Sequence, residues 1–371
     1  MKILFSDNSL WSLIQFRGNV IRNLIAKGYD VVLVAPFEHL SDERKIEGVK
    51  YLYIPLERNK NSLMALVIYV YRLFLIYKKE RPDVIFQYTI KPNLIGSIIA
   101  KILSIPSISM IAGLGYTFSN NNIKNKIINQ LYSFALNLNF KVLFLNTNDF
   151  NVFRKNGFVN IDKMYLLKGG EGVDLNRYIT NNKNISNESV NFLMVARILW
   201  DKGYGEYVEA AKVLLKRHSN VNFAICGYID EDYPTGVPKS IVEENHKNSI
   251  VTYLGCVEDV RPLINNSDCI VLPSYYNEGL NRSLMEAISM SKPIITTNQQ
   301  GCEELVDDGI NGFLVEKMSV ESLVVGIEKV VSLGKDGIVK MGIKSREIAV
   351  QKFSDNLVID AYHNFINEVL K

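Results

Sequence analysis

Short runs of β-branched and aliphatic residues alternate with amphipathic stretches along this chain, and this alternation limits the possible folds strongly. In the first half, KILFS at 2–6 predicts a strand, 11–28 predicts a helix, and DVVLVAP at 30–36 predicts a second strand. The second half repeats the rhythm, with a strand at 189–197 and a helix over 204–218. Strands that alternate with helices form parallel sheets with helices on both faces. The sequence therefore predicts an α/β fold.

The length of the chain and one polar stretch predict two domains. The chain has 371 residues, whereas most single domains have about 100–150. The segment NRYITNNKNISNESV at 176–190 is rich in Asn and Ser, which is typical of a linker. We expect a first Rossmann-like domain over 1–178, a second over 190–350, and a C-terminal helix within 351–371 that crosses back to the first domain. Ligands of such sheets bind beyond the carboxyl ends of the strands, so the expected site is a central cleft between the two domains.

Charge is divided unevenly between the two halves. Residues 1–175 contain 22 Lys and Arg against 13 Asp and Glu, a balance of +9, whereas residues 176–371 contain 20 against 26, a balance of −6. The net charge of only +3 argues against a nucleic-acid partner. The basic first half suits an anionic membrane surface. The composition of an Asn- and Lys-rich chain is the alternative explanation.

The most hydrophobic run, LMALVIYVYRLFLIY at 63–77, predicts a helix. With fifteen residues it is shorter than the ~20 that a membrane span needs. An ordinary helix packed on a sheet is the simpler interpretation. Its tyrosines and the following Lys78 and Lys79 would also suit a helix that lies at a membrane interface.

Cysteine and histidine give no sign of a metal site. The four cysteines all lie in the second half without a C-x-x-C pair, and the four histidines are scattered. Because each cysteine neighbours apolar residues, we expect all four to be buried thiols in a reduced compartment. Neither a metal nor another cofactor is expected.

Two glutamates follow the strand predicted at 268–274, in the segment YNEGLNRSLMEA. Glu278 stands beside Gly279 in a loop, and Glu286 lies on the flank of a helix that we expect to start near Gly279. A glycine lets the backbone approach a ligand, and a helix N-terminus attracts phosphate. A carboxylate can accept hydrogen bonds from two neighbouring sugar hydroxyls. The pair could hold two ends of one elongated ligand, or Glu286 could form a plain i, i+4 ion pair with Arg282.

Two cations follow the first predicted strand of the second domain. Arg197 and Lys202, in VARILWDKG at 195–203, would face the same edge of the sheet as the glutamates. Two fixed cations beside a helix N-terminus can hold a diphosphate without a metal, and solvated surface charges are the alternative. A second glycine-containing loop at 301–315 is expected close by.

Four segments in chain order together resemble glycosyltransferase family 4. They are GGEGVDLNRY at 169–178, Arg197 with Lys202, the segment from Glu278 to Glu286, and ELVDDGINGFLV at 304–315. The resemblance extends over nearly the whole chain. The stretches FRGNVIRNLIAKGYDVVLVAP, TIKPNLIGSIIAKILSIP and IAGLGYTFS are similar to the capsule and O-antigen branch. ARILWDKGYGEYVEAA is similar to transferases that extend sugars on undecaprenyl diphosphate, including those that add N-acetylgalactosamine.

This resemblance implies the GT-B fold, with a sugar nucleotide bound mainly to the second domain. It implies that Glu278 binds the hexose, that Glu286 binds the ribose, and that Arg197 and Lys202 neutralise the leaving diphosphate. Backbone amides of three residues would assist them, namely Gly279, Leu280 and Asn281. The anomeric configuration would be retained through front-face attack without a divalent metal, and no glutamate would act as the nucleophile, unlike in glycosidases.

The first domain departs from the family pattern. The Gly-Gly loop after the first strand is replaced by SDNSLWSLIQFRG, and Ile111 or Ala112 stands where many relatives have histidine. Gln87-Tyr88-Thr89 replaces an H-x-H-like feature, so the catalytic histidine of the family has no counterpart here. We expect Arg17 and Lys91 to contact the acceptor, and a solvated lysine at a helix start is the alternative for Lys91.

The expected activity is transfer of a hexose or N-acetylhexosamine, first N-acetylgalactosamine and then galactose, glucose or N-acetylglucosamine. The donor would be a UDP-sugar, and the acceptor an undecaprenyl-diphosphate-linked saccharide in O-antigen, capsule or glycan assembly. The protein would be cytoplasmic and attached peripherally to the cytoplasmic face of the inner membrane. The alternative is a sugar-nucleotide epimerase or another GT-B enzyme without a lipid acceptor. A dinucleotide-binding dehydrogenase is disfavoured because neither first strand is followed by G-x-G-x-x-G.

Overall fold

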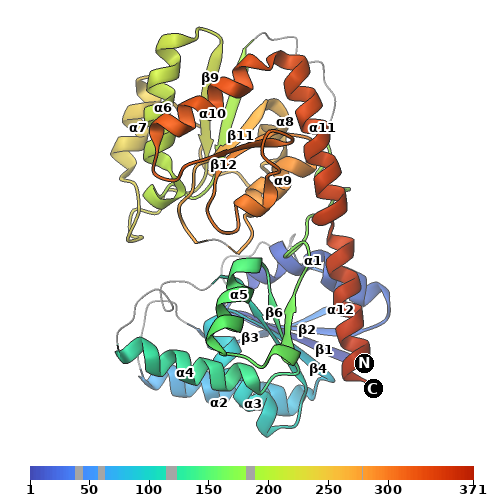
Figure 1. The fold of residues 1–371 in the computed structure, drawn as a ribbon. Helices are drawn as coiled ribbons and strands as arrows, with labels where there is room; N and C mark the ends of the chain where they lie inside the picture. Colours follow the sequence, from blue (N-terminus) through green and yellow to red (C-terminus); the bar gives the residue numbers. More distant parts are fainter. Residues whose placement is uncertain (38–44, 57–62, 114–122, 181–188, 278) are drawn as a thin grey trace. The chain divides into compact units, whose positions relative to one another are not determined.

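The computed structural model describes residues 1–37, 45–56, 63–113, 123–180, 189–277 and 279–371 (Figure 1). These residues form two compact units, the first made of 1–172 with 355–371, the second of 173–354. The boundary precedes the polar stretch that predicts a linker. Val173 and Tyr178 are buried in the core of the second unit, so residues 173–178 belong to that unit and not to the first domain or a linker.

The first unit is built on seven parallel strands in the order β3-β2-β1-β4-β5-β6-β7. They are β1 (Lys2–Ser6), β2 (Asp30–Ala35), β3 (Val49–Tyr53), β4 (Val84–Tyr88), β5 (Ser107–Ile111), β6 (Lys141–Phe144) and β7 (Met164–Leu166). The strand order reverses between β1 and β4. This is the point at which a doubly wound sheet opens a crevice beyond its carboxyl edge.

Six α-helices cover this sheet in the described part of the first unit. They are α1 (Leu10–Ala26), α2 (Leu63–Glu80), α3 (Ser97–Ile102), α4 (Ile123–Asn137), α5 (Thr147–Asn156) and α12 (Asp355–Val369). A π-helical turn, Pro92–Gly96, precedes α3. Residues 355–371 lie in the first unit, where α12 packs with α1.

Alternation along the strands decides which helices share a face of the sheet. Ile3 and Phe5 pack in one buried cluster with α1 and α12, whereas Leu4 packs in another with α2 and α3. The strand register puts Ile85, Ile111 and Phe144 on the same face as Leu4. Because Ile111 and Phe144 pack with residues of α4, the helices α2, α3 and α4 all cover one face.

The second unit has six parallel strands in the order β10-β9-β8-β11-β12-β13. The strands are β8 (Val190–Val195), β9 (Val221–Cys226), β10 (Thr252–Tyr253), β11 (Cys269–Leu272), β12 (Ile294–Thr297) and β13 (Gly312–Val315). The helices are α6 (Tyr204–Arg217), α7 (Lys239–Lys247), α8 (Arg261–Asn266), α9 (Arg282–Ser289), α10 (Val320–Ser332) and α11 (Gly334–Lys352). Short 3-10 helices lie at Trp200–Lys202 and Glu303–Leu305 in this unit and at Ile161–Lys163 in the first. The strand order reverses between β8 and β11.

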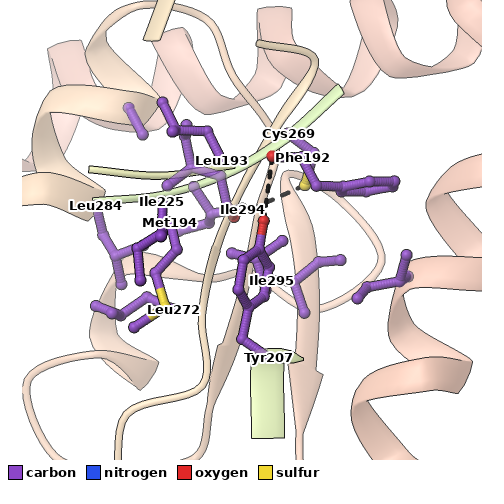
Figure 2. Close-up of a cluster of buried hydrophobic side chains, with 14 of the residues drawn as sticks. Phe192, Leu193, Met194, Tyr207, Ile225, Cys269, Leu272, Leu284, Ile294 and Ile295 are labelled. Carbon is purple, nitrogen blue, oxygen red and sulfur yellow. Dashed lines mark hydrogen bonds between the residues drawn. The ribbon is translucent and has the colours of Figure 1, made fainter. Parts of the chain in front are cut away.

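The core of the second unit is one continuous apolar cluster. Figure 2 shows part of it around Tyr207, whose hydroxyl donates to the carbonyl oxygen of Phe192 at 3.1 Å. Cys226, Cys269 and Cys302 are buried as expected, but Cys256 is exposed, so the prediction that all four are buried is wrong. Cys256 follows Gly255 just beyond the short strand β10, where little of the core reaches it.

The chain passes between the units twice, at Gly172–Val173 and at Ser354–Asp355. Within the second unit, the amide of Val173 donates to the carbonyl oxygen of Phe353 at 2.8 Å. Within the first unit, Gly172 has φ +69°, and a Cβ there would lie 2.6 Å from the Cα of Asp355. This close approach requires glycine. Among the helices of the described ranges, none is long and apolar enough to cross a membrane.

Candidate active site

The two loops that flank the strand reversal in the second unit are tied together by backbone contacts. The carbonyl oxygen of Asp201, after β8, accepts the amides of Tyr275 and Tyr276, after β11, at 2.9 and 3.0 Å. Gly203 has φ +83°, and a Cβ there would lie 2.3 Å from the carbonyl oxygen of Pro273. These contacts fix the two loops against each other at the carboxyl edge of the sheet, where we call them the wall.

The two predicted cations lie on this wall. The side chain of Arg197 is 42% exposed, with a guanidinium nitrogen 3.5 Å from the carboxylate of Asp230. Its guanidinium carbon lies 4.7 Å from the centre of the Tyr233 ring, and the amine of Lys202 lies 4.7 Å from the centre of the Tyr276 ring. Lys202 is only 7% exposed. A ring face attracts a cation electrostatically, so each tyrosine helps to fix the position of its cation.

The two tyrosines connect the cations. The hydroxyls of Tyr233 and Tyr276 are 3.5 Å apart, so a chain of contacts runs from Arg197 through both rings to Lys202. The motifs in the sequence point to the cations and not to Tyr233, which lies on a loop after β9. Tyr276 could have been found, because it immediately precedes the Asn277-Glu278 pair of the motif.

The predicted role of Asn281 and the predicted helix start need correction. The structure starts α9 at Arg282, not near Gly279, because the side chain of Asn281 caps the helix by accepting from the amide of Leu284 at 3.0 Å. The amide of Asn281 already donates to the carbonyl oxygen of Gly301 at 2.9 Å. Asn281 thus fixes the helix N-terminus instead of offering its amide to a ligand.

The remaining residues of this segment are only partly placed. Glu278 lies outside the described residues, and Gly279 and Leu280 immediately precede the cap of α9. The side-chain amide of Gln299 donates to the side-chain oxygen of Asn277 at 2.6 Å. Together with the bond between Asn281 and Gly301, this places the loop after β12 beside Asn277 and Asn281, close to the segment as predicted for the glycine loop.

Glu286 forms the ion pair that was the alternative to a ligand contact. It is buried in the second turn of α9, and one carboxylate oxygen accepts from the side chain of Arg282 at 2.9 Å. Burial first, and then the nearby Glu286 carboxylate, raise the pKa of Tyr178 well above its ordinary value. Leu284, Ala287 and Ile288 on the same helix are fully buried. Arg282 therefore orients the carboxylate of Glu286 before any ligand binds.

A cavity of about 330 Å³ lies at the strand reversal of the first unit, which is within the size range of small-ligand sites. Its wall includes Lys91, one of the two predicted acceptor contacts. Asn93 donates to the carbonyl oxygen of Met110 and to the hydroxyl of Tyr132, both at 2.9 Å, while its buried side-chain oxygen has no hydrogen-bond partner among the described residues. The other lining residues are Asn8, Leu56, Thr89, Ile90, Ile111, Ala112 and Gly113.

Arg17, the other predicted acceptor contact, lies in a buried charge cluster and not on the cavity wall. It is 4% exposed, forms an ion pair with Glu171, and has its guanidinium carbon 4.2 Å from the centre of the Tyr88 ring. Burial raises the pKa of the neighbouring Asp7 to about 6, against the opposing effect of Arg17. In the described structure Arg17 is therefore buried and ion-paired, and its side chain has no exposed face for an acceptor.

The C-terminal helix completes this cluster. The hydroxyls of Tyr88 and Tyr362, a residue of α12, are 2.7 Å apart, and the Tyr362 ring stacks on Phe86 at 4.7 Å. No cluster of His, Cys, Asp and Glu that could hold a metal occurs in the parts of the chain that the structure describes.

Each unit matches a known family model. Residues 2–147 match the model described as glycosyl transferase 4-like, and residues 177–346 match glycosyl transferases group 1. A Campylobacter jejuni relative, N,N'-diacetylbacillosaminyl-diphospho-undecaprenol alpha-1,3-N-acetylgalactosaminyltransferase, is 25% identical over 100% of both chains. An Escherichia coli relative, UDP-Gal:alpha-D-GlcNAc-diphosphoundecaprenol alpha-1,3-galactosyltransferase, is 23% identical over 76% of this chain and 75% of its own.

Solved structures share the fold. A glycosyltransferase from Rickettsia africae aligns with a TM-score of 0.83 and 20% identity, over 100% of this chain and 98% of its own. The Anabaena protein HepE in complex with UDP aligns with a TM-score of 0.80 and 19% identity, over 99% of this chain and 100% of its own.

Proposed function

Because the chain belongs to the glycosyltransferases of the GT-B type, we propose that it transfers a hexose or N-acetylhexosamine from a UDP-sugar to an undecaprenyl-diphosphate-linked saccharide. The observation that carries this proposal is the pair Arg197 and Lys202, held over tyrosine rings where β8 and β11 diverge. A sugar nucleotide leaves as a nucleoside diphosphate, and the charge that develops on that diphosphate is what two fixed cations stabilise.

The donor is held by the second unit in this proposal. Lys202, which is buried, contacts the diphosphate. Arg197 leaves its partly exposed ion pair with Asp230 and binds a phosphate oxygen instead. Glu286 accepts from the ribose hydroxyls, oriented by Arg282, and Glu278 accepts from the hexose hydroxyls. Gly279 and Leu280 lie where their amides would approach the diphosphate.

The reaction proceeds with retention in this proposal. The acceptor hydroxyl attacks C1 of the donor from the face that the diphosphate leaves, and a phosphate oxygen takes the proton of that hydroxyl. No carboxylate forms a bond to the sugar, so the role of Glu278 is to orient the hexose. Arg197 and Lys202 supply the charge neutralisation, and we expect transfer to continue in the presence of EDTA.

The acceptor is held by the first unit in this proposal. Lys91 on the cavity wall contacts the acceptor diphosphate, and the buried oxygen of Asn93 can accept from a sugar hydroxyl. Two relatives carry undecaprenol-linked diphospho-sugars in their names, and the relative aligned over the whole chain is an N-acetylgalactosaminyltransferase. N-acetylgalactosamine is therefore our first candidate, before galactose, glucose and N-acetylglucosamine, in assembly of an O-antigen, capsule or related glycan at the cytoplasmic face of the inner membrane.

A donor screen tests the proposal. The protein is incubated with each UDP-sugar and a diphospholipid-linked saccharide, with and without EDTA, and products are identified by mass and anomeric configuration. We expect one donor to give an acceptor enlarged by one sugar. If no donor gives transfer with folded protein, the proposal is wrong. A UDP-sugar that changes without an acceptor would instead indicate an epimerase.

A further inference from the structure

The helix α2 presents an unusually apolar face to solvent. Its inward stripe is Tyr69, Leu73 and Tyr77, spaced four residues apart and buried against the sheet. Eight of its 18 residues are exposed large apolar side chains, namely Leu63, Met64, Leu66, Val67, Ile68, Val70, Tyr71 and Leu75. By comparison, the 17-residue α1 has only Trp11 in this class. Contiguous apolar exposure on this scale marks an interaction surface.

The apolar exposure extends to neighbouring helices on the same face of the sheet. The helix α3 packs against both α2 and α4, and Figure 1 shows the three helices on one side of the first unit. Ile102 at the end of α3 and Leu131 and Phe134 on α4 are also exposed. We call these three residues and the eight of α2 the apolar face.

Exposed cations accompany the apolar face. Arg72, Lys78 and Lys79 lie on α2, and Lys101 lies on α3, all exposed. The acidic residue of α2, Glu80, is buried and paired with Lys2 and Lys50, so it does not neutralise the outward side. Apolar side chains beside lysine and arginine match the boundary between acyl chains and anionic headgroups.

We propose that the apolar face is a docking surface for an anionic lipid bilayer. The inward stripe keeps α2 attached to the sheet, so the helix lies in the plane of the interface, with its apolar side chains in the acyl boundary and its cations at the headgroups. This rests on the proposed function, since a lipid-linked acceptor must be reached at a membrane. Leu56 lines the first-unit cavity and packs against the apolar cluster beneath α2, so docking brings the cavity to the headgroup layer.

Vesicle binding by the full chain tests the proposal. The test variant is Leu63→Ser/Val67→Ser/Tyr71→Ser, which removes one outward stripe of α2 whose members are 76%, 55% and 63% exposed. The matched control is Val339→Ser/Ile343→Ser/Val350→Ser, which changes exposed apolar residues of α11 in the second unit. Binding is measured by flotation with phosphatidylglycerol–phosphatidylethanolamine vesicles and with pure phosphatidylcholine vesicles.

We expect the α2 variant to bind anionic vesicles at least about tenfold more weakly than wild type and the α11 variant to bind like wild type. Lys78→Gln/Lys79→Gln should weaken binding to anionic vesicles only. Equal melting temperatures will show that the α2 variant is folded. If the α2 variant floats like wild type, or wild type does not float, the proposal is wrong. It is also wrong if light scattering shows that the α2 substitutions convert a dimer to a monomer while vesicle binding is unchanged, because a second copy then covers the face.

The same proteins separate this proposal from the proposed function. Flotation needs neither donor nor acceptor, so a failed donor screen leaves the vesicle result interpretable. With a short-chain, water-soluble acceptor the α2 variant should transfer sugar at the wild-type rate. With a long-chain acceptor in vesicles its rate should fall about as much as its vesicle binding. An equal loss with both acceptors would contradict a docking role.

Discussion

Between β1 and β4 the first unit encloses Arg17 in a buried ion pair, whereas between β8 and β11 the second unit holds a half-exposed arginine and a buried lysine. Arg17 is paired with Glu171 and enclosed by Tyr88 and Tyr362. Arg197, by contrast, is half exposed, and its partner Asp230 is also partly exposed. Both clusters follow the strand at which the sheet order reverses.

The difference shows that the strand order determines where a ligand can bind, whereas the side chains at that position determine which ligand can bind. A buried ion pair that is fully enclosed mainly orders its surroundings, because a ligand would have to break it. The ion pair of Arg197 with Asp230 is partly exposed, so a ligand can replace Asp230 at much lower cost. The first unit therefore offers a cavity with one lysine on its wall, and the second holds the two cations at which we propose that a diphosphate binds.

The largest expected effect comes from Lys202. Lys202→Ala should lower the rate of transfer by about 10²–10³-fold, because a fixed positive charge is lost where the leaving diphosphate develops charge. The matched control is Lys212→Ala, an exposed lysine of α6 that pairs with Glu209. Initial rates at saturating donor measure the effect. A rate equal to that of the control would show that Lys202 does not stabilise the leaving diphosphate.

The contact between the two loops of the second unit can be broken at Gly203. Gly203→Ala should cost about 2–4 kcal/mol of unfolding free energy, because the new Cβ meets Pro273 and the backbone has a positive φ. Gly255→Ala is the control, since Gly255 has φ +77° but nothing within 4 Å. The control should cost only about 1 kcal/mol. Urea unfolding of both variants measures the difference, and equal costs would show that the Pro273 contact is unimportant.

The buried charges of the first unit can be tested through pH. Burial raises the pKa of Asp7 to about 6 from 3.8, so the folded state binds its proton more tightly than the unfolded state. The stabilisation of the folded state by the protonated Asp7 carboxyl is complete below pH 3.8, and it is lost as the pH rises through about 6. Asp7→Asn should therefore gain about 2–3 kcal/mol relative to wild type between pH 4 and pH 7. Urea unfolding at both pH values measures this gain, and a difference between variant and wild type that is independent of pH would refute it.

The smallest expected effect is at the cavity of the first unit. Lys91→Ala should raise the KM for the lipid-linked acceptor about 3–10-fold and leave the KM for the donor unchanged, because one partly hydrated charge contact is lost. Lys155→Ala, an exposed lysine of α5, is the control. An increase in the donor KM instead would show that Lys91 contacts the donor and not the acceptor.

Local patterns in the sequence predicted most of the fold, but they did not predict which residues from distant parts of the chain contact each site residue. The strands and the positions of Arg197 and Lys202 follow from alternation and from loops after strands. The start of α9 was missed although Asn281 is a favourable capping residue, because the glycine before it is also a helix-start signal. The burial of Arg17 could not be predicted, because its partners, Glu171 and Tyr362, lie far along the chain. Burial of Tyr178 in an Asn-rich stretch depends in the same way on distant packing.

The position of α12 has a consequence for biosynthesis. The second unit is continuous in sequence, so it can fold as soon as residue 354 has left the ribosome. The first unit begins to be synthesised earlier, yet its core lacks Val358, Tyr362, Phe365 and Ile366 until α12 has been synthesised. Part of one face of its sheet therefore stays uncovered while the second unit is being made. The unit whose synthesis begins first is the one that finishes folding last.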